Sequence, residues 1–279
     1  MPATLLSHQA IVLPLKMRWP HLFSGLALCI GSMAPDLEFI GRMDDDWLFS
    51  HTIAAQLWFT VPITALLVWL VSAQLIPALL PYLPDHAWWR PHDLAAIRPP
   101  RTARAWARVA LSAWIGGMSH IILDGVTHGN HSGWLVPWMP GLRTMVPHVG
   151  GAVPLHDALQ FWCTIVFAIA TLVLWRRMVR ERSLWRWQQQ GDEVVPVLPL
   201  APMPRAHGVR IARVLGLMAA LGAMAGHALR EGEVGGSVLA GVAFGAIDFA
   251  LVAAILLALG IRRRGAPSGA EAVGLEATP

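Results

Sequence analysis

The segment SHIILDGVTHG, residues 119–129, places three groups that can bind a metal ion or move a proton at intervals of four residues. These groups are His120, Asp124 and His128. Residues four apart on a helix lie one turn apart on the same face, so neighbouring members of the trio can reach one ion. The outer two stand about 12 Å apart along a straight helix. One ion therefore cannot take all three there, which leaves His128 to bind from a loop, to hold a second metal or to meet a substrate.

Other short motifs supply the same residue types. GSMAPDLEFI contains Asp36 and Glu38, FSHTIA contains His51, and LLSHQA contains His8. Imidazole and carboxylate together are ligands for Zn²⁺, Mn²⁺ or Fe²⁺. Taken alone, the trio around residue 124 also fits a hydrogen-bonded helix end facing water. The four motifs together predict a divalent-metal site, with zinc as the first expectation.

The composition predicts the membrane as the setting of this site. The chain is 55% hydrophobic and 14% charged, with a mean hydropathy of +0.52, whereas a soluble domain carries about a quarter charged residues. Fourteen tryptophans also fit a membrane interface. The net charge of +4 comes from arginines in loops between apolar runs, so we exclude nucleic acid as a partner.

Six apolar segments predict an all-α, polytopic membrane protein. They are residues 20–34, 52–80, 106–124, 155–175, 209–229 and 234–260, and the first is short for a span of about 20 residues. The corresponding organisation is a metal-site membrane domain (1–175), a cytoplasmic linker rich in Arg and Pro (176–208), a transmembrane hairpin (209–262) and a disordered tail (263–279).

The distribution of Lys and Arg predicts the orientation. Eighteen of the 21 cationic residues fall on one side of this topology and three on the other, which makes the richer side cytoplasmic. The candidate ligands then gather near the outer face. His8 fits only if the N-terminus forms a re-entrant helical hairpin, in which residues 4–15 descend, KMRWP turns and residues 20–34 return toward Asp36.

The motifs also resemble a known family. Ser7-His8, Ala34-Pro35-Asp36-Leu37-Glu38, Ser50-His51, Ser119-His120-x-x-Leu123-Asp124-x-x-Thr127-His128-Gly129 and Gly133-Trp134-Leu135-Val136-Pro137-Trp138 look like the bacterial membrane-bound, predicted metal-dependent hydrolases of the YdjM type. The nearest branch is an uncharacterised one that begins MPxTxSH and continues GSMAPDLE. The resemblance covers about residues 1–175.

This resemblance implies a bacterial inner-membrane location and a metal site carried by His8, Asp36, His51, His120 and Asp124. The chain departs from the related branch in two places. Glu38 stands where Asp is usual, and FSHTIA replaces HRGxTHS around His51, which removes an upstream histidine and weakens the case for a second metal.

The leading interpretation is a metal-dependent hydrolase that acts on an ester or phosphoester, with a lipid as the natural partner, at the outer membrane face. In it Glu38 is a ligand or the general base, and His128 assists the leaving group or binds substrate. A structural protein stapled by a metal and a divalent-metal transporter are the alternatives. A serine hydrolase is excluded for want of a GxSxG motif. The sequence makes no prediction of the oligomeric state.

Overall fold

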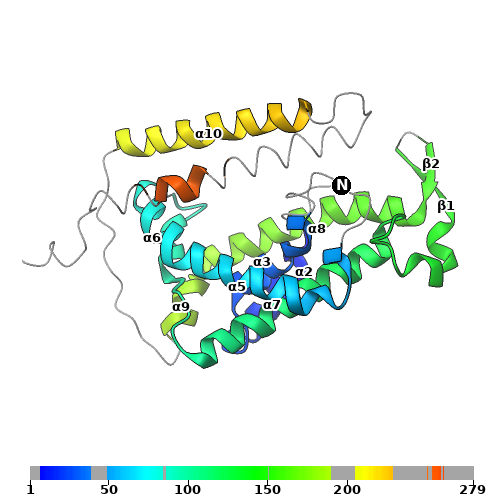
Figure 1. Cartoon of the computed structure of the whole chain (residues 1–279), viewed down its shortest axis with the longest axis horizontal. Coiled ribbons are helices and arrows are strands. Elements are labelled where there is room, and N and C mark those ends of the chain that lie inside the picture. Colours follow the sequence, from blue (N-terminus) through cyan, green and yellow to red (C-terminus); the bar gives the residue numbers. More distant parts are fainter. Residues whose placement is uncertain are drawn as a thin grey trace, which may run out of the picture. The chain divides into compact units, whose positions relative to one another are not determined.

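The computed structural model of the chain describes residues 7–38, 49–83, 86–149, 151–189, 205–228, 250, 253–258 and 260. The described part is mostly helical (Figure 1). The chain divides into two compact units. The first comprises Met1–Trp69 and Pro99–Glu181, and the second comprises Leu70–Arg98 and Arg182–Pro279. All seven candidate site residues belong to the first unit.

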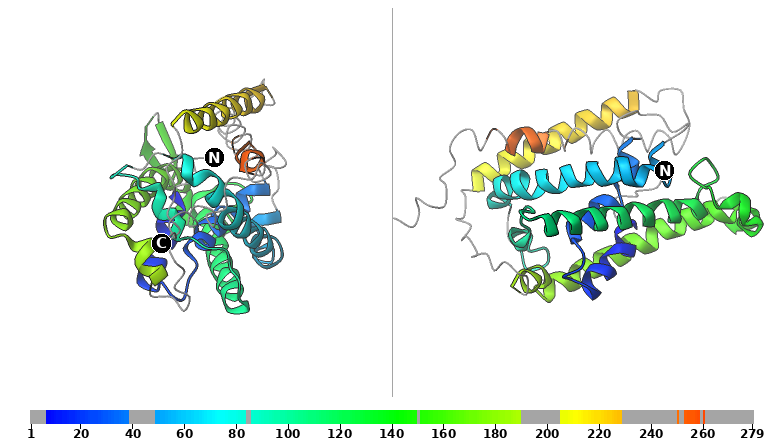
Figure 2. Two further views of the ribbon diagram at one scale, coloured as in Figure 1. Left: turned by 90° about the vertical axis from the view of Figure 1, so that its left-hand side faces the viewer. Right: turned by 60° about the horizontal axis from the view of Figure 1, so that its bottom comes forward.

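Helices dominate the first unit, with one small hairpin at an end (Figure 2). Its helices are α2 (Gln9–Arg18), α3 (Gly25–Gly31), η3 (Gln56–Thr60), α5 (Val61–Leu70), α7 (Ala103–Thr127) and α8 (Leu155–Arg180), with short 3₁₀ turns η1 (Ala34–Asp36), η2 (Phe49–His51), η7 (Val136–Trp138) and η8 (Pro140–Arg143). Strands β1 (Met145–His148) and β2 (Gly151–Pro154) pair antiparallel, with Met145 opposite Pro154.

Three helices in the described part of the chain are long and apolar enough to cross a membrane. They run over Gln56–Tyr82, Ala103–Thr127 and Leu155–Arg180. At 1.5 Å of rise per residue each exceeds the roughly 30 Å thickness of a bilayer core. They coincide with the second, third and fourth segments expected from the sequence.

The first expected segment differs from a single span. A turn around Pro20 separates α2 from α3, and α3 has only seven residues. Pro20 has no N–H with which to continue a helix, and the Lys16 ammonium instead bonds the carbonyls of Pro20 at 2.5 Å and Phe23 at 2.9 Å. Ser24 then begins α3 by accepting the Ala27 N–H. Residues 20–34 therefore form a short helix flanked by turns.

The span Gln56–Tyr82 contains two wide, π-helical turns, η3 and η4 (Val71–Leu75). Pro62 follows the first and Pro77 the second. A proline cannot donate to the carbonyl four residues earlier, so a wider turn accommodates each missing hydrogen bond.

The second unit contains α6 (Ile76–Leu79), η5 (Leu80–Tyr82), η6 (Pro91–Ala96), α9 (Ser183–Gln189) and α10 (Arg205–Ala228). Helix α10 covers the fifth expected segment. The expected linker is helical up to Gln189, and residues 190–204 of it lie outside the described residues. Residues 229–249, which include the start of the sixth expected segment at residue 234, and the tail after residue 260 also lie outside them.

A close crossing of α3 and α7 sets the position of the candidate site. At the crossing, a Cβ on Gly31 would lie 2.6 Å from the Ala113 carbonyl oxygen, and one on Gly116 would lie 2.6 Å from the Leu28 carbonyl oxygen. Only glycine permits this backbone approach. As a result the end of α3 reaches the side chain of His120, one turn further along α7.

Candidate metal centre

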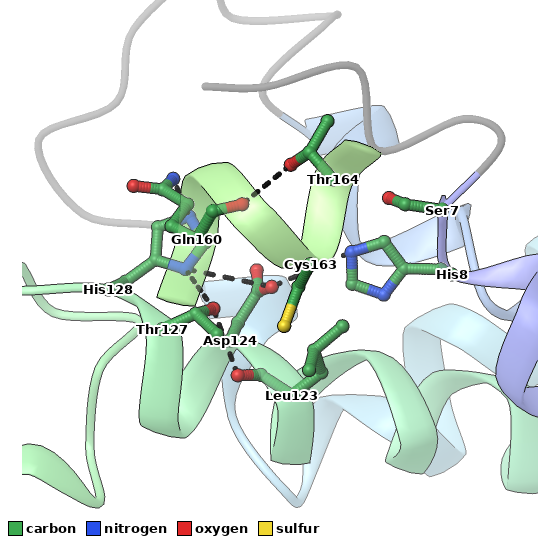
Figure 3. A pocket seen from close by; sticks show the side chains of 9 residues that line it. All are labelled: Ser7, His8, Leu123, Asp124, Thr127, His128, Gln160, Cys163 and Thr164. Carbon is green, nitrogen blue, oxygen red and sulfur yellow. Dashed lines mark hydrogen bonds and ion pairs between the residues drawn. The ribbon is translucent and has the colours of Figure 1, made fainter. Parts of the chain in front are cut away.

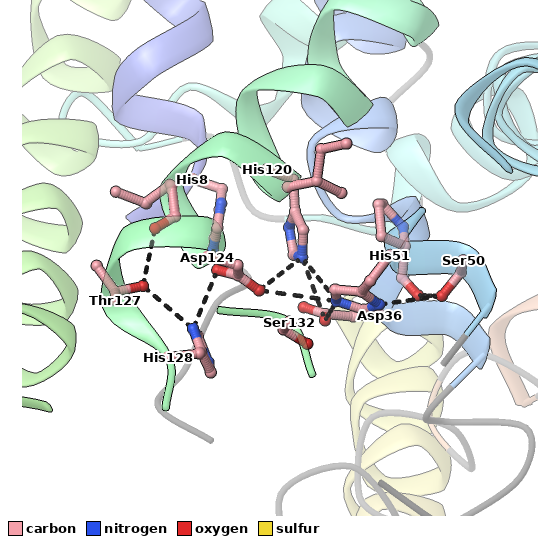
Figure 4. Close-up of polar contacts among 12 residues, drawn as sticks. His8, Asp36, Ser50, His51, His120, Asp124, Thr127, His128 and Ser132 are labelled. Atoms are coloured by element: carbon pink, nitrogen blue, oxygen red, sulfur yellow. Dashed lines mark hydrogen bonds and ion pairs between the residues drawn. The ribbon is translucent and has the colours of Figure 1, made fainter. Parts of the chain in front are cut away.

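Four buried side chains form a cluster that could hold a metal ion. They are Asp36 from η1, His51 from η2, and His120 and Asp124 from α7. One ligand atom from each lies within 4.8 Å of the others, and Figure 4 shows all four side chains converging. His120 is fully buried, and the other three are at most 8% exposed.

The separations between the ligand atoms suit a small cation. His120 Nε2 lies 3.3 Å from His51 Nε2, 3.2 Å from Asp124 Oδ2 and 3.5 Å from Asp36 Oδ1. His51 Nε2 lies 3.6 Å from Asp36 Oδ1 and 3.7 Å from Asp124 Oδ2. A tetrahedral shell with metal–ligand distances of about 2.0–2.1 Å places its ligand atoms about 3.3–3.4 Å apart. The five separations that involve an imidazole thus match such a shell within about 0.4 Å.

Hydrogen bonding fixes which nitrogen of His120 faces the cluster as a lone pair. His120 Nδ1 lies 2.9 Å from the Ser32 carbonyl oxygen at the end of α3. A carbonyl only accepts, so Nδ1 carries the proton and the neutral ring presents an unprotonated Nε2. A backbone carbonyl on the far nitrogen is the usual support of a metal-binding histidine.

The ring of His51 is oriented in the same way through a hydroxyl. The Ser50 hydroxyl donates to the Pro35 carbonyl at 2.7 Å. Its oxygen therefore accepts from His51 Nδ1, 3.1 Å away. His51 Nε2 is again left as a lone pair toward the carboxylates, so the two imidazoles face each other with no proton required between them.

Asp36 is a buried carboxylate without a hydrogen-bond donor. Neither of its oxygens has a hydrogen-bond partner among the described residues, and the imidazole nitrogens at 3.5 and 3.6 Å are too far for good hydrogen bonds. Burial raises the pKa of Asp36, but the charge of His120 in its protonated form and the contacts from His120 and His51 outweigh burial and lower this pKa below its ordinary value. The carboxylate is therefore held ionised in a place where a cation would satisfy it.

Protons are the competitors of a metal here. Burial lowers the pKa of His51, yet the neighbouring carboxylates of Asp124 and Asp36 outweigh burial and raise this pKa above its ordinary value. A metal-free cluster therefore takes up a proton on His51 more readily than a free imidazole does, and metal binding must release it.

The sequence-predicted His8 lies at the edge of this cluster. Its ring stacks on that of His120, with centroids 4.2 Å apart, and its Nε2 lies 3.6 Å from Asp124 Oδ1. Burial, followed by the charge of His120, lowers its pKa to about 4, so the ring is neutral at pH 7. The short hairpin of α2 and α3 thus brings residue 8 to the site. His8 faces Asp124 Oδ1, whereas His120 faces Asp124 Oδ2.

His128 is engaged at both ring nitrogens. The Thr127 hydroxyl donates to the Leu123 carbonyl at 3.0 Å, so its oxygen accepts from His128 Nδ1, 3.1 Å away. His128 Nε2 then accepts from the Gln160 amide at 2.8 Å. Helix α7 ends at Thr127, one residue before His128. The side chain therefore projects from the helix end, and its Nδ1 lies 3.6 Å from Asp124 Oδ1.

The sequence-predicted base, Glu38, has a visible structural contact. Its Oε2 accepts the backbone N–H of Ser50 at 2.8 Å, and the side chain is 6% exposed. Glu38 therefore holds the turn that carries His51. The four-residue ligand cluster includes Asp36 and not Glu38.

Two glutamines support the site without having been predicted. Gln56 donates to the carbonyls of Ser50 at 2.7 Å and Thr52 at 3.0 Å, which ties the His51 turn to the helix Gln56–Tyr82. Gln160 orients His128, as described above. A glutamine in an otherwise apolar segment, as Gln56 is, was the available signal in the sequence, but its partners are set by tertiary packing.

Comparison with known proteins assigns the chain to a family. Residues 1–259 match the family model described as "Domain of unknown function (DUF4184)". The chain belongs to this family. The match extends past residue 175, the end of the resemblance drawn from the sequence motifs. No curated protein and no solved structure matches the chain significantly.

The DUF4184 chain thus joins a membrane-type helical scaffold to a cluster of two imidazoles and two carboxylates. Such ligands suit Zn²⁺, Mn²⁺ or Fe²⁺, and the geometry alone does not select among them. Chemically, the cluster can bind a divalent cation, and a bound cation would offset the negative charge of Asp36 and Asp124.

Proposed function

We propose that this protein is a membrane-embedded, metal-dependent hydrolase of an ester or phosphoester. The observation that carries the proposal is the convergence of the Nε2 atoms of His51 and His120, 3.3 Å apart, with two buried carboxylates. When both rings are neutral no donor lies between the four atoms, so the constellation favours a cation over a hydrogen-bond network. The resemblance to the YdjM-type predicted hydrolases supports the same reading. Zinc is the metal we propose.

A divalent metal, when bound, lowers the pKa of a bound water and polarises the bond to be cleaved. Asp36, His51, His120 and Asp124 would hold it. We propose Glu38 as the base that takes a proton from the attacking water, and His128 as the group that meets the substrate. Glu38 also accepts the backbone N–H of Ser50, and this hydrogen bond fixes the position of its carboxylate.

The surroundings support a lipid substrate. Trp134 and Trp138 lie on the loop after α7, and they are 37% and 81% exposed. Tryptophan favours the membrane–water interface. We propose that this loop meets the outer face of a bacterial inner membrane, that the chain has about six membrane segments, and that the first of these belongs to a re-entrant α2–α3 hairpin.

A metal staple is the second candidate, and the count of ligands favours it. Four protein ligands complete a tetrahedral shell, whereas catalytic zinc sites usually keep one position for water. Hydrolysis at this site therefore requires a fifth coordination position or the release of one carboxylate. A staple requires neither.

Glu38→Gln separates the two candidates once a metal analysis and a screen of lipid and phosphoester substrates are in hand. The glutamine oxygen can still accept the Ser50 N–H, so fold and metal content should persist. Loss of a positioned base should lower turnover by about 10²–10⁴-fold. Glu181→Gln, at a partly exposed site paired with Arg177, is the matched control and should leave turnover unchanged.

Three results would revise the proposal. Loss of metal from Glu38→Gln would make Glu38 a ligand. Full turnover in that variant would reject Glu38 as the base and leave it only the structural role of binding the Ser50 N–H. A tightly bound metal with no turnover on any substrate in the screen would favour the staple.

A further inference from the structure

A small pocket adjoins the metal cluster on the other side of Asp124. Asp124 Oδ2 faces His120 and His51, whereas Oδ1 faces His8 and His128, each 3.6 Å away. Figure 3 shows the lining side chains, which come from the start of the described N-terminal segment, the end of α7 and the first turns of α8. The shared carboxylate makes this pocket the immediate neighbour of any bound cation.

The two threonine hydroxyls in the lining are already committed as donors elsewhere. The Thr164 hydroxyl donates to the Gln160 carbonyl at 2.7 Å, and the Thr127 hydroxyl donates to the Leu123 carbonyl at 3.0 Å. An amide N–H of Gln160 is used on His128. These hydroxyl oxygens keep lone pairs but have no proton left to offer.

Acceptors remain available in the same lining. Asp124 Oδ1 has only imidazole nitrogens beside it, at distances beyond a good hydrogen bond. His8 Nδ1 is buried and has no hydrogen-bond partner among the described residues. The nearby carboxylate favours the proton of His8 on Nε2, which leaves Nδ1 as another lone pair. The pocket therefore suits a ligand that donates hydrogen bonds.

Charge points in the same direction. The described lining contains one carboxylate, Asp124, and no Lys or Arg. A divalent cation in the cluster would be offset by Asp36 and Asp124, so it would leave little net positive charge for the pocket. A phosphate diester would bring only acceptor oxygens, and any phosphate would bring further negative charge against these lone pairs.

We propose that this pocket binds a small, uncharged hydroxyl group of the ligand, of the kind that glycerol carries, and not a phosphate. The inference rests on the proposed function, because it assigns the pocket to the substrate of the metal site. It specifies that function as cleavage of an ester that has a free hydroxyl next to the reacting centre.

Cys163 provides a native reporter, because its side chain lines the pocket. In a Cys29→Ala background it is the only thiol of the chain. The zinc-loaded protein would be treated with methyl methanethiosulfonate in the presence of glycerol, inorganic phosphate or polyvinylpyrrolidone, which has no hydroxyl group and serves as a control of matched viscosity. Glycerol at twice its dissociation constant should slow the labelling of Cys163 about threefold, whereas phosphate and polyvinylpyrrolidone should leave the rate unchanged.

Thr164→Val removes one open acceptor and fills the same space. It should abolish protection by glycerol while the labelling rate without glycerol stays at the parent value, which also shows that the pocket is intact. A monoacylglycerol in detergent micelles then distinguishes a lipid hydroxyl from a free polyol. Stronger protection by the micelles than by glycerol at equal hydroxyl concentration identifies the lipid.

Protection by phosphate, or no protection by either hydroxyl compound, would overturn the inference. These outcomes are distinct from failure of the proposed function. Hydrolysis of a phosphoester without protection by hydroxyl compounds would keep the enzyme and reject the pocket assignment. Protection without hydrolysis of any substrate would keep the pocket and reject the enzyme.

Discussion

Two buried aspartates in this protein show how a structural carboxylate differs from one that is prepared for a cation. In the second unit, Asp93 is 5% exposed and accepts a hydrogen bond from Trp185 Nε1 at 3.0 Å, with the Arg182 guanidinium 3.4 Å away. In the first unit, Asp36 is 4% exposed and has no hydrogen-bond donor among the described residues. Its nearest neighbours are the Nε2 atoms of His120 and His51, which face it as lone pairs when the rings are neutral.

Burial of a charge is costly unless the charge is paired. Asp93 is paired by side chains of the chain itself, so its role is complete in the folded protein. Asp36 lies where the missing partner must be a proton on a neighbouring imidazole or a metal ion. The two aspartates are equally buried, so what distinguishes the structural carboxylate from the candidate ligand is whether the protein itself supplies a hydrogen-bond donor.

The largest effect should come from His120→Ala. It removes the central imidazole, which is within 3.5 Å of both carboxylates and of His51, so the bound metal should be lost. Loss of a ligand present at about 100 times its dissociation constant costs the folded state about 2.7 kcal/mol. Metal content by mass spectrometry and the thermal unfolding midpoint measure both effects. Unchanged metal stoichiometry would eliminate the cluster as the site.

His131→Ala is the matched control for that variant. His131 is exposed and follows the end of α7 by four residues. Its replacement should change neither metal content nor the unfolding midpoint.

The aspartates themselves give the next effect. Asp36→Asn should lower metal affinity strongly and should destabilise the metal-loaded protein. The loss of stability relative to the parent protein should shrink when variant and parent are both stripped of metal with a chelator, because the partner that Asp36 loses is the metal. Asp93→Asn should leave metal affinity unchanged and cost about 0.5–1.5 kcal/mol of unfolding free energy with or without chelator. A chelator-independent cost for Asp36→Asn would make Asp36 a fold contact like Asp93.

The pH dependence should have opposite signs in the two metal states. In the metal-free protein the raised pKa of His51 means that its protonated form stabilises the fold below the unfolded pKa. That contribution is lost as pH rises through the folded pKa. Metal binding requires the neutral ring and so strengthens as pH rises. The difference in unfolding free energy between metal-loaded and metal-free protein should therefore grow from about pH 5 to pH 8. A difference independent of pH would argue against His51 as a ligand.

The smallest effect should come from Gln160→Leu. Removing the donor to His128 Nε2 frees that ring without touching the four-residue cluster. Loss of such a supporting hydrogen bond should lower metal affinity by no more than about 10–100-fold. Thr171→Val, further along α8, is a buried control on the same helix. A larger loss from Gln160→Leu than from His120→Ala would mean that His128 and not His120 anchors the ion.

The sequence predicted the parts of this architecture that depend on local pattern. The i, i+4 spacing of His120 and Asp124 placed them on one face of a helix, and they lie 3.2 Å apart there. Three long apolar segments appear as three helices of spanning length. The positive-inside orientation and the six spans stay predictions.

Other features depend on packing that no local pattern contains. The first expected span is a short helix between turns, because Pro20 breaks it and Lys16 caps the carbonyls of the turn. Ser32 and His120 are 88 residues apart in sequence. The hydrogen bond between the Ser32 carbonyl and His120 requires α3 and α7 to cross closely at Gly31 and Gly116. The role of Gln160 likewise follows only from the contact of α8 with the end of α7.

X-ray absorption spectroscopy at the edge of the bound metal tests the central claim most directly. For zinc, the account predicts about one ion per chain in a shell of nitrogen and oxygen at about 2.0–2.2 Å, with imidazole scattering from two histidines. Loss of the imidazole signal with His120→Ala would assign it to the cluster. A sulfur shell at about 2.3 Å, which only a cysteine or methionine could supply, or purified protein without a stoichiometric metal, would contradict the account.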